Sequence, residues 1–289
     1  MWSKTRFDPF LMAFRAIALA LPLVTGGVAV AQKSARPAAP TLPSTAAPIN
    51  IDVAATRAEL FGTDSARAAV AAAKLGQSRQ PGALDALLDG LAMGFVPAVA
   101  GPAIDAVAEH RSPVAVDVLL HYARYRNADV RARATLALGY SDDKRAVAAW
   151  RAAFSDGDGV VRAAAAKVAA ARQDVTSIEP LLVLLKKGDE ASAVALAAMA
   201  SADIARRVAE LIGEAPDRLV GECLGAILLS PNLGKEEIYV EIVRAVGKIP
   251  GDEAVVALTG FIGATPEKPP RQSRREAQVL YEQRLGGDN

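Results

Sequence analysis

The residue types that most often carry catalysis or hold metals are scarce in this sequence. Its two histidines, His110 and His121, stand eleven positions apart, a spacing that brings two side chains near one face of an uninterrupted helix. Ser112 and Pro113 lie between them, and a proline inside a helix breaks or kinks it. We therefore expect no metal shared by the two histidines. The single cysteine excludes a disulfide within the chain and a cysteine-rich zinc module.

Two further features that could do chemistry have simpler structural explanations. Residues 156–159, DGDG, resemble part of a calcium-binding loop, but the closing glutamate and the remaining oxygen ligands of an EF-hand are missing. A turn between two helices that ends in an N-cap explains the same residues. Cys223 lies in an apolar helical stretch, where core packing is its expected role. Because the sequence contains no nucleophile elbow, Walker loop or dinucleotide fingerprint, it predicts neither an enzyme nor a cofactor.

Composition restricts the fold that must position these residues. The chain is 52% hydrophobic and 22% charged, which favours a folded domain over disorder, and only 5% aromatic. Alanine accounts for 62 of the 289 residues. Because alanine favours helices and fills a β-sheet core poorly, we expect an all-α fold. The net charge of +1 lacks the clustered basic excess that nucleic-acid binding needs, so no nucleic-acid partner is predicted.

The N-terminus has the order of residues of a secretory signal peptide. Three basic residues, Lys4, Arg6 and Arg15, precede an apolar stretch over residues 16–31, which closes on the small residues Ala29 and Ala31. This stretch is shorter than the roughly 20 residues that a membrane-spanning helix needs. We expect a signal peptide over residues 1–31, cleaved after Ala31, and hence a periplasmic or secreted protein with no membrane span after cleavage. Retention of the segment as an uncleaved anchor stays open.

Three further segments follow from shifts in composition. Residues 32–50 contain four prolines among alanine, serine and threonine, which is typical of an extended linker. Residues 51–265 carry apolar residues at helical spacing and are the expected repeat domain. Residues 266–289 form a basic C-terminal tail with a predicted helix. That helix either covers the last repeat or reaches a partner or an anionic surface.

A period of 31 residues organises the repeat domain. One column of equivalent positions holds Leu88, Leu119, Trp150, Leu181 and Ile212. A second column holds Ala103, Ala134, Ala165, Leu196 and Ile227. Thirty-one residues suit two helices of about 12 residues joined by tight turns, and such a pair buries its apolar face only against neighbouring pairs. We predict an α-solenoid, a superhelical stack of about six helix pairs with both columns in its core.

The second helix of each pair resembles that of HEAT repeats. Residues 127–139, NADVRARATLALG, and residues 158–166, DGVVRAAAA, are similar to the HEAT pattern of Asp, Val, Arg, Ala, Leu and Gly at fixed spacing. Residues 242–258 repeat the turn and second helix, but they are out of step with the period, so we expect extra residues around 229–237. The resemblance is to the short bacterial HEAT-like variety, because 31 residues are fewer than the 40 to 47 of longer units.

The resemblance also implies a structural role for two arginines. In HEAT-type stacks, arginines in the first turn of the second helix pair with acidic residues at neighbouring turns. Arg131 and Arg162 occupy that position, and Asp129 and Asp158 are suitably placed to be their partners. The alternative is that the two arginines contact an acidic ligand.

The expected function is that of a scaffold or adaptor, which binds a protein or peptide partner on the concave face of the stack. The second helices contribute that face, and its expected residues are Ala132, Arg133, Leu136, Ala163, Ala164 and Lys167. Of these, Arg133, Leu136 and Lys167 are the predicted partner-binding residues. The sequence does not indicate an oligomeric state.

Two other functions remain possible from the sequence. HEAT-like relatives of the phycobilin lyase kind handle a chromophore in the groove, so a lyase-like protein that binds a tetrapyrrole or another small ligand is the main alternative. The aromatic residues available for such a pocket are Tyr122, Tyr125, Tyr140 and Trp150, although their helical spacing is also that of core and rim positions. A purely structural spacer is the third possibility.

Overall fold

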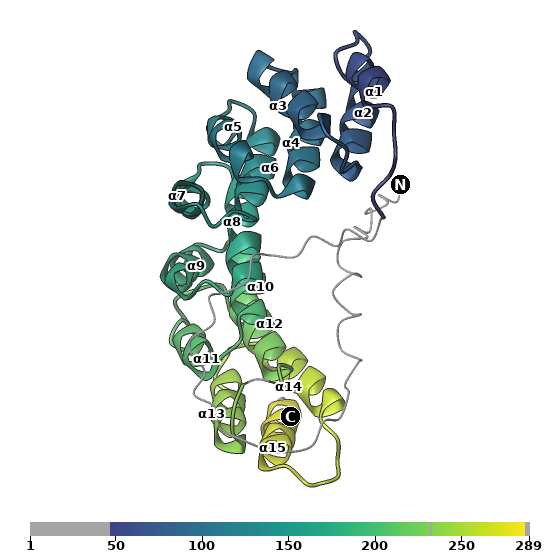
Figure 1. Cartoon of the computed structure of the whole chain (residues 1–289). Helices are drawn as coiled ribbons and strands as arrows, with labels where there is room; N and C mark the ends of the chain where they lie inside the picture. The colour runs from purple at the N-terminus through teal and green to yellow at the C-terminus, as the bar shows by residue number, and fades with distance from the viewer. Residues whose placement is uncertain (1–46, 232, 287–289) are drawn as a thin grey trace, which may run out of the picture. The chain divides into compact units, whose positions relative to one another are not determined.

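The described part of the chain is built of helices in two layers. The computed structural model describes residues 47–231 and 233–286, so the predicted signal peptide over 1–31, and residues 32–46 of the linker, lie outside the described residues. Odd-numbered helices form one layer and even-numbered helices the other (Figure 1). Among the described residues there is no strand, and the helices make seven successive pairs. The predicted all-α solenoid is confirmed.

Each pair consists of one helix from each layer. The odd-numbered layer contains α1 (Val53–Leu60), α3 (Ala83–Met93), α5 (Val116–Tyr122), α7 (Lys144–Ala152), α9 (Ile178–Lys186), α11 (Ala202–Ala209) and α13 (Glu236–Val246). The even-numbered layer contains α2 (Ser65–Gln77), α4 (Pro97–His110), α6 (Ala128–Leu138), α8 (Gly159–Arg172), α10 (Glu190–Ala198), α12 (Asp217–Leu228) and α14 (Glu253–Ala264). Short 3-10 turns at Pro113–Ala115, Ala153–Ser155 and Val175–Ser177 adjoin α5, α7 and α9.

Small side chains let successive even-numbered helices pack closely. The second predicted column is fully buried in this layer, at Ala103, Ala134, Ala165, Leu196 and Ile227. Gly76 on α2 leaves so little room that a Cβ atom there would lie 2.7 Å from the Cα of Ala106 on α4. At Gly139, just after α6, a Cβ atom would lie 2.6 Å from a side-chain methyl group, Cγ2 of Val168 on α8. The alanine-rich composition is therefore a consequence of backbone-to-backbone proximity in one layer.

The period of 31 residues holds in the middle of the stack and breaks after α10. Helices α4, α6, α8 and α10 begin at residues 97, 128, 159 and 190, but α12 and α14 begin at 217 and 253, which are steps of 27 and 36. The first column is accordingly buried at Leu119, Trp150 and Leu181. Leu88 and Ile212, at the two ends of the column, pack against the core but are only partly buried. Ile212 lies beyond the end of α11, because the register changes after the short α10. The extra residues expected near 229–237 are found in the turn between α12 and α13.

Regularly spaced caps start the even-numbered helices in the middle of the stack. Asn127, Asp158 and Asp189 are the N-caps of α6, α8 and α10, and each side chain accepts a hydrogen bond from a backbone N–H of the first turn. They stand 31 residues apart, so the turn chemistry repeats with the packing. This confirms that residues 156–159 are a turn with an N-cap, since Asp158 caps α8.

The two first-turn arginines connect consecutive repeats. The Arg131 guanidinium donates to both carboxylate oxygens of Asp156, through Nε and Nη2 at 2.9 Å each. The Nε of Arg162 lies 3.6 Å from Oδ1 of Asp189. The predicted ladder is therefore present, but Asp129 and Asp158 are not the carboxylates that these arginines bind. Because an arginine side chain reaches forward to the next turn, its partner comes from the following repeat rather than its own.

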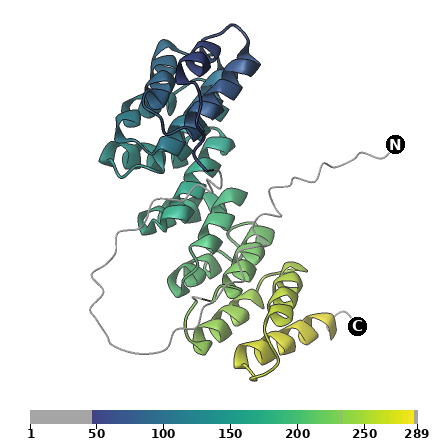
Figure 2. The same cartoon turned by 45° about the vertical axis from the view of Figure 1, so that its right-hand side comes forward.

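The last helix, α15 (Gln272–Gly286), covers the end of the stack. It packs against both α13 and α14 (Figures 1 and 2). Ala277 is fully buried in this contact, and Leu280 lies against Gly247. The Arg284 guanidinium donates to the backbone carbonyls of Gly247 and Ile249 at 2.8 and 2.6 Å. These contacts shelter a pair that would otherwise expose its apolar side to water.

The close approach of α2 and α4 predicts that a glycine-to-alanine substitution at Gly76 is destabilising, whereas the same substitution at an open helical position is not. We expect Gly76→Ala to destabilise the protein by about 1 to 3 kcal/mol, because the new methyl group meets backbone atoms that cannot move aside. The matched control is Gly260→Ala in α14, where a Cβ meets nothing within 4 Å. That change should stabilise by up to about 1 kcal/mol through helix propensity. Urea unfolding followed by circular dichroism measures both, and equal effects would contradict close packing at Gly76.

The link between Arg131 and Asp156 predicts a pH-dependent loss of stability. Hydrogen bonds from Arg131 hold the pKa of Asp156 below its usual value, so the pair stabilises the fold at neutral pH and stops doing so as the pH falls below about 4. We expect Asp156→Asn to cost about 2 kcal/mol at pH 7, and the difference from the unsubstituted protein to shrink in acid. Asp158→Asn is the control, because asparagine also caps helices. Chemical denaturation at pH 7 and at a pH below about 4 measures the free energy of unfolding of both proteins. A loss of stability that is the same at the two pH values contradicts this expectation.

Candidate functional site

Two grooves open between neighbouring odd-numbered helices. They exist because these helices pack against one another less closely than the even-numbered helices do. One lies between α11 and α13 and the other between α5 and α7, with volumes of about 680 and 930 Å³. We call them the α11/α13 groove and the α5/α7 groove. Both volumes fall in the range of ligand or peptide sites.

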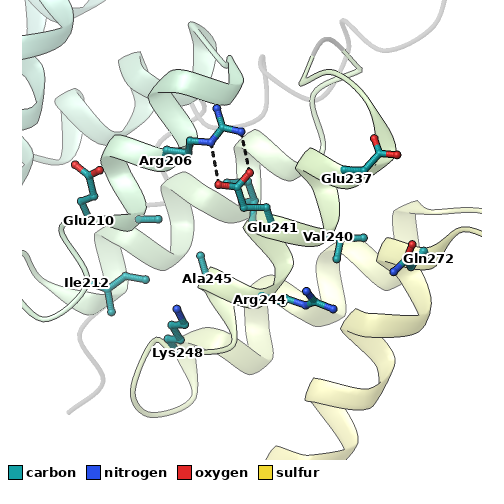
Figure 3. Close-up of a pocket in the computed structure, with 12 residues that line it drawn as sticks. Arg206, Glu210, Ile212, Glu237, Val240, Glu241, Arg244, Ala245, Lys248 and Gln272 are labelled. Carbon is teal, nitrogen blue, oxygen red and sulfur yellow. Dashed lines mark hydrogen bonds and ion pairs between the residues drawn. The ribbon is translucent and has the colours of Figure 1, made fainter.

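The α11/α13 groove combines a small-residue floor with a charged rim (Figure 3). Ala209 and Ala245 leave the space between the helices open, and Val240 adds apolar surface. Across the rim, Arg206 donates to the two carboxylate oxygens of Glu241 from Nε and Nη2, each at 2.8 Å. These hydrogen bonds lower the pKa of Glu241. A carboxylate held ionised in this way acts as a fixed charge rather than as a proton donor.

Other charges of both signs surround this fork. Glu210, Glu237 and Lys248 line the same groove, and Arg244 binds Glu276 of α15 through Nε at 2.7 Å. Figure 3 shows Glu237 and Gln272 on the side of the groove toward α15. The arrangement is suited to binding a polar surface with mixed charge, and its lining holds neither cysteine nor histidine.

The α5/α7 groove has a different lining. Leu120 and His121 come from α5, and three alanines and Arg145 come from α7. Residues 124–126, Arg-Tyr-Arg, come from the turn after α5. This lining contains no carboxylate. It is therefore basic and aromatic where the α11/α13 groove is mixed.

The predicted partner-binding residues belong to the even-numbered layer. Helices α4, α6, α8 and α10 begin 31 residues apart, so the ninth residue of each occupies an equivalent place. These residues, which we call the ninth-position row, are Asp105, Leu136, Lys167 and Ala198. Leu136 is partly buried, and the other three are exposed. Two of the three predicted residues thus stand in one row.

Arg133 lies beside this row and is already engaged. Its guanidinium forms an ion pair with Asp105, and its side chain lies against Gly101 on α4. Burial raises the pKa of Asp105, and Arg133 opposes that shift. Arg133 therefore joins α4 to α6 and presents part of its charge to the surface.

Two of the chemically suggestive residues of the sequence, His110 and Cys223, have structural roles. His110 is the last residue of α4, and its Nε2 lies 3.0 Å from the carbonyl oxygen of Leu75 in α2. His121 is exposed in the α5/α7 groove. Cys223 is buried in α12, and burial raises the pKa of its thiol to about 12, so the thiol is protonated and unreactive at neutral pH. Core packing of Cys223 is confirmed.

The four aromatic residues considered for a chromophore do not line one pocket. Trp150 and Tyr122 are fully buried in the core, and the Tyr122 hydroxyl donates to the Leu91 carbonyl at 2.8 Å. Tyr125 lines the α5/α7 groove, and Tyr140 lies under the guanidinium of Arg111. Each is a core or rim residue, and only Tyr125 is available to a ligand in that groove.

The described residues lack two kinds of feature, a membrane-spanning helix and a cluster of metal ligands. No helix among residues 47–231 and 233–286 is long and apolar enough to cross a bilayer. Within the same residues, no group of three or more histidine, cysteine, aspartate or glutamate side chains is arranged to hold a metal ion.

The grooves were missed by sequence reasoning, because they depend on which helices of the odd-numbered layer are neighbours. The basic and aromatic composition of residues 124–126 was visible in the sequence. What the sequence did not show is that the facing side of α7 is made of alanines at that point. Arg206 and Glu241 were likewise unremarkable in the sequence, since 35 positions separate them.

Two solved structures of other proteins are similar to this chain. The subunits CpcE and CpcF of phycocyanin lyase from Nostoc sp. PCC7120 include a chain that is 18% identical, with a TM-score of 0.43, and the match covers 83% of this chain and 97% of that one. A designed armadillo repeat protein is 14% identical, with a TM-score of 0.34 and coverage of 80% and 99%. No curated protein has a sequence that matches this chain.

A family model matches the middle of the stack. Residues 116–202 match the model of HEAT repeats, and this range runs from the first residue of α5 to the first residue of α11. It is the part of the stack in which the 31-residue period and the arginine ladder are both regular. The described residues therefore form an α-solenoid in which residues 116–202 are similar to HEAT repeats.

Proposed function

We propose that this protein is an exported scaffold that binds a protein or peptide partner along the ninth-position row. The observation that carries the proposal is the row itself, in which consecutive repeats present a carboxylate, a leucine, an ammonium group and an alanine at the same register. Packed helices lie about 8 to 10 Å apart, and an extended peptide advances about 3.3 Å per residue. Such a peptide meets one side chain of the row at roughly every third residue.

The chemistry of the row favours recognition over catalysis. Asp105 is already paired with Arg133, so these two residues offer hydrogen bonds at fixed positions. Leu136 supplies an apolar contact that is held in place by the core beneath it. Side chains fixed in this way lose little conformational entropy when a partner binds.

Export rests on the sequence of residues 1–31, with its basic start, apolar stretch and small residues at the cleavage position. Removing these residues takes away three basic side chains and one acidic one, which leaves 30 basic residues against 31 acidic ones. A protein of nearly neutral charge recognises partners through local pairs and shape rather than through a long-range field.

The proposed row can be tested by site-specific photo-crosslinking in the native cell envelope. A benzoylphenylalanine residue at Lys167 or Ala198 should give adducts of discrete mass, and adding Lys167→Glu to the Ala198 probe should weaken them. Val183 on α9 is the control position, because it is also exposed but lies in the odd-numbered layer. Adducts of the same mass and yield from Val183, or unchanged adducts with Lys167→Glu, would favour a structural spacer instead.

Export predicts a defined N-terminus. We expect the protein from the envelope fraction to begin at Gln32, which intact-mass measurement reads directly. Ala31→Arg should block processing, because signal peptidase requires a small residue at this position. An exported protein that keeps Met1 and resists alkaline extraction from membranes would show instead that the segment is an uncleaved anchor.

A further inference from the structure

The α5/α7 groove carries positive charge that the described part of the protein does not neutralise. Most arginines in this part pair with a carboxylate, as Arg131 does, or bind backbone carbonyls, as Arg284 does. Arg124 and Arg126 are both exposed, and neither guanidinium has a hydrogen bond or ion pair to another described residue. The two arginines flank Tyr125 in one turn of the same groove.

The backbone of this turn is held in place by the arginine ladder. Nη1 of Arg131 donates to the carbonyl oxygens of Tyr125 and Arg126, at 3.0 and 3.1 Å. The same guanidinium is fixed by Asp156 of the next repeat. The backbone of the turn is thus fixed by hydrogen bonds, while the side chains of Arg124 and Arg126 are exposed to solvent and can contact a ligand. A site that is ordered before binding loses less entropy when a ligand arrives.

Tyr125 gives the groove an aromatic surface of fixed orientation. Its ring centroid lies 5.5 Å from that of Tyr122, which is buried and hydrogen-bonded to the Leu91 carbonyl. A tyrosine supported in this way can pack against an apolar side chain at small entropic cost.

The opposite wall is small and apolar. Ala148, Ala149 and Ala152 lie on one face of α7 and line the groove. Arg145 at the same face is already bound, by Asp117 at 2.6 Å and by Asp143 at 3.0 Å. Arg145 therefore adds little net charge. The free positive charge is concentrated on the turn, and the room for an apolar side chain is beside α7.

We propose that the α5/α7 groove binds an acidic peptide segment. Carboxylates of the segment pair with Arg124 and Arg126, and an adjacent apolar side chain packs against Tyr125 and the alanines of α7. The planar guanidinium matches a carboxylate with two hydrogen bonds. Two arginines beside an apolar wall fit this ligand better than a nucleic acid, which needs a longer run of cations along its backbone. The site lies in the odd-numbered layer, so it does not depend on the ninth-position row.

The test is a binding titration of the full chain with a fluorescein-labelled peptide rich in glutamate and leucine, followed by fluorescence anisotropy. We expect saturable binding that weakens with salt, because the contacts are charged and exposed. R124Q/R126Q should weaken binding about tenfold or more. The double variant K187Q/R275Q is the matched control, because it removes the same charge at exposed positions outside the groove. It should change affinity by less than about twofold.

A charge exchange separates recognition from loss of folding. R124E/R126E should lose the glutamate peptide and gain binding to a peptide with lysine in place of glutamate, which an unfolded protein does not do. The proposal is overturned if the peptide does not bind, if K187Q/R275Q weakens binding as much as R124Q/R126Q, or if a peptide with glutamine in place of glutamate binds equally well. Tighter binding of a single-stranded oligonucleotide of equal charge would also overturn it.

Discussion

No helix pair in this protein can bury its apolar face without the next pair, and the rest of the structure follows from that constraint. In the even-numbered layer the constraint is met by near contact between backbones, as Gly76 against Ala106 shows. Alanines one period apart, such as Ala134 and Ala165, fill the interface with little side-chain volume. Stability of such a stack is a sum over neighbouring repeats, so one oversized side chain disturbs the repeats on both sides.

Polar interactions follow the same period because they are attached to the same turns. Asn127, Asp158 and Asp189 cap successive helices, and Arg131 reaches from one turn to the carboxylate of the next. Apolar packing holds neighbouring repeats together but does not favour one relative orientation. The hydrogen bonds of the ladder do, because they have a preferred geometry. The ladder also determines the geometry of the exposed turn at residues 124–126, because the same guanidinium binds the carbonyl oxygens there. A structural ion pair and a proposed binding surface share one side chain.

The difference between the two layers accounts for where binding surfaces lie. Close packing in the even-numbered layer leaves a continuous surface in register, on which the ninth-position row stands. Looser contact in the odd-numbered layer leaves grooves between helices, whose character depends on a few side chains. In the α11/α13 groove Arg206 pairs with Glu241, whereas the turn of the α5/α7 groove has two guanidinium groups that pair with no described residue. One architecture thus offers surfaces of different chemistry from repeat to repeat.

The sequence by itself determined the all-α solenoid and the buried columns through Ala165 and Trp150, because the residues that pack against neighbouring repeats recur in each repeat. The resemblance of its second helices to HEAT repeats added the expectation of an arginine ladder. Tertiary structure alone decided the exception at Ile212, since the register after α10 depends on helix lengths that periodicity does not reveal. It also decided that Asp156 is the partner of Arg131 and which charges remain unpaired. Ion pairs and grooves join residues from different repeats, and their geometry is set by how the layers pack rather than by any local pattern.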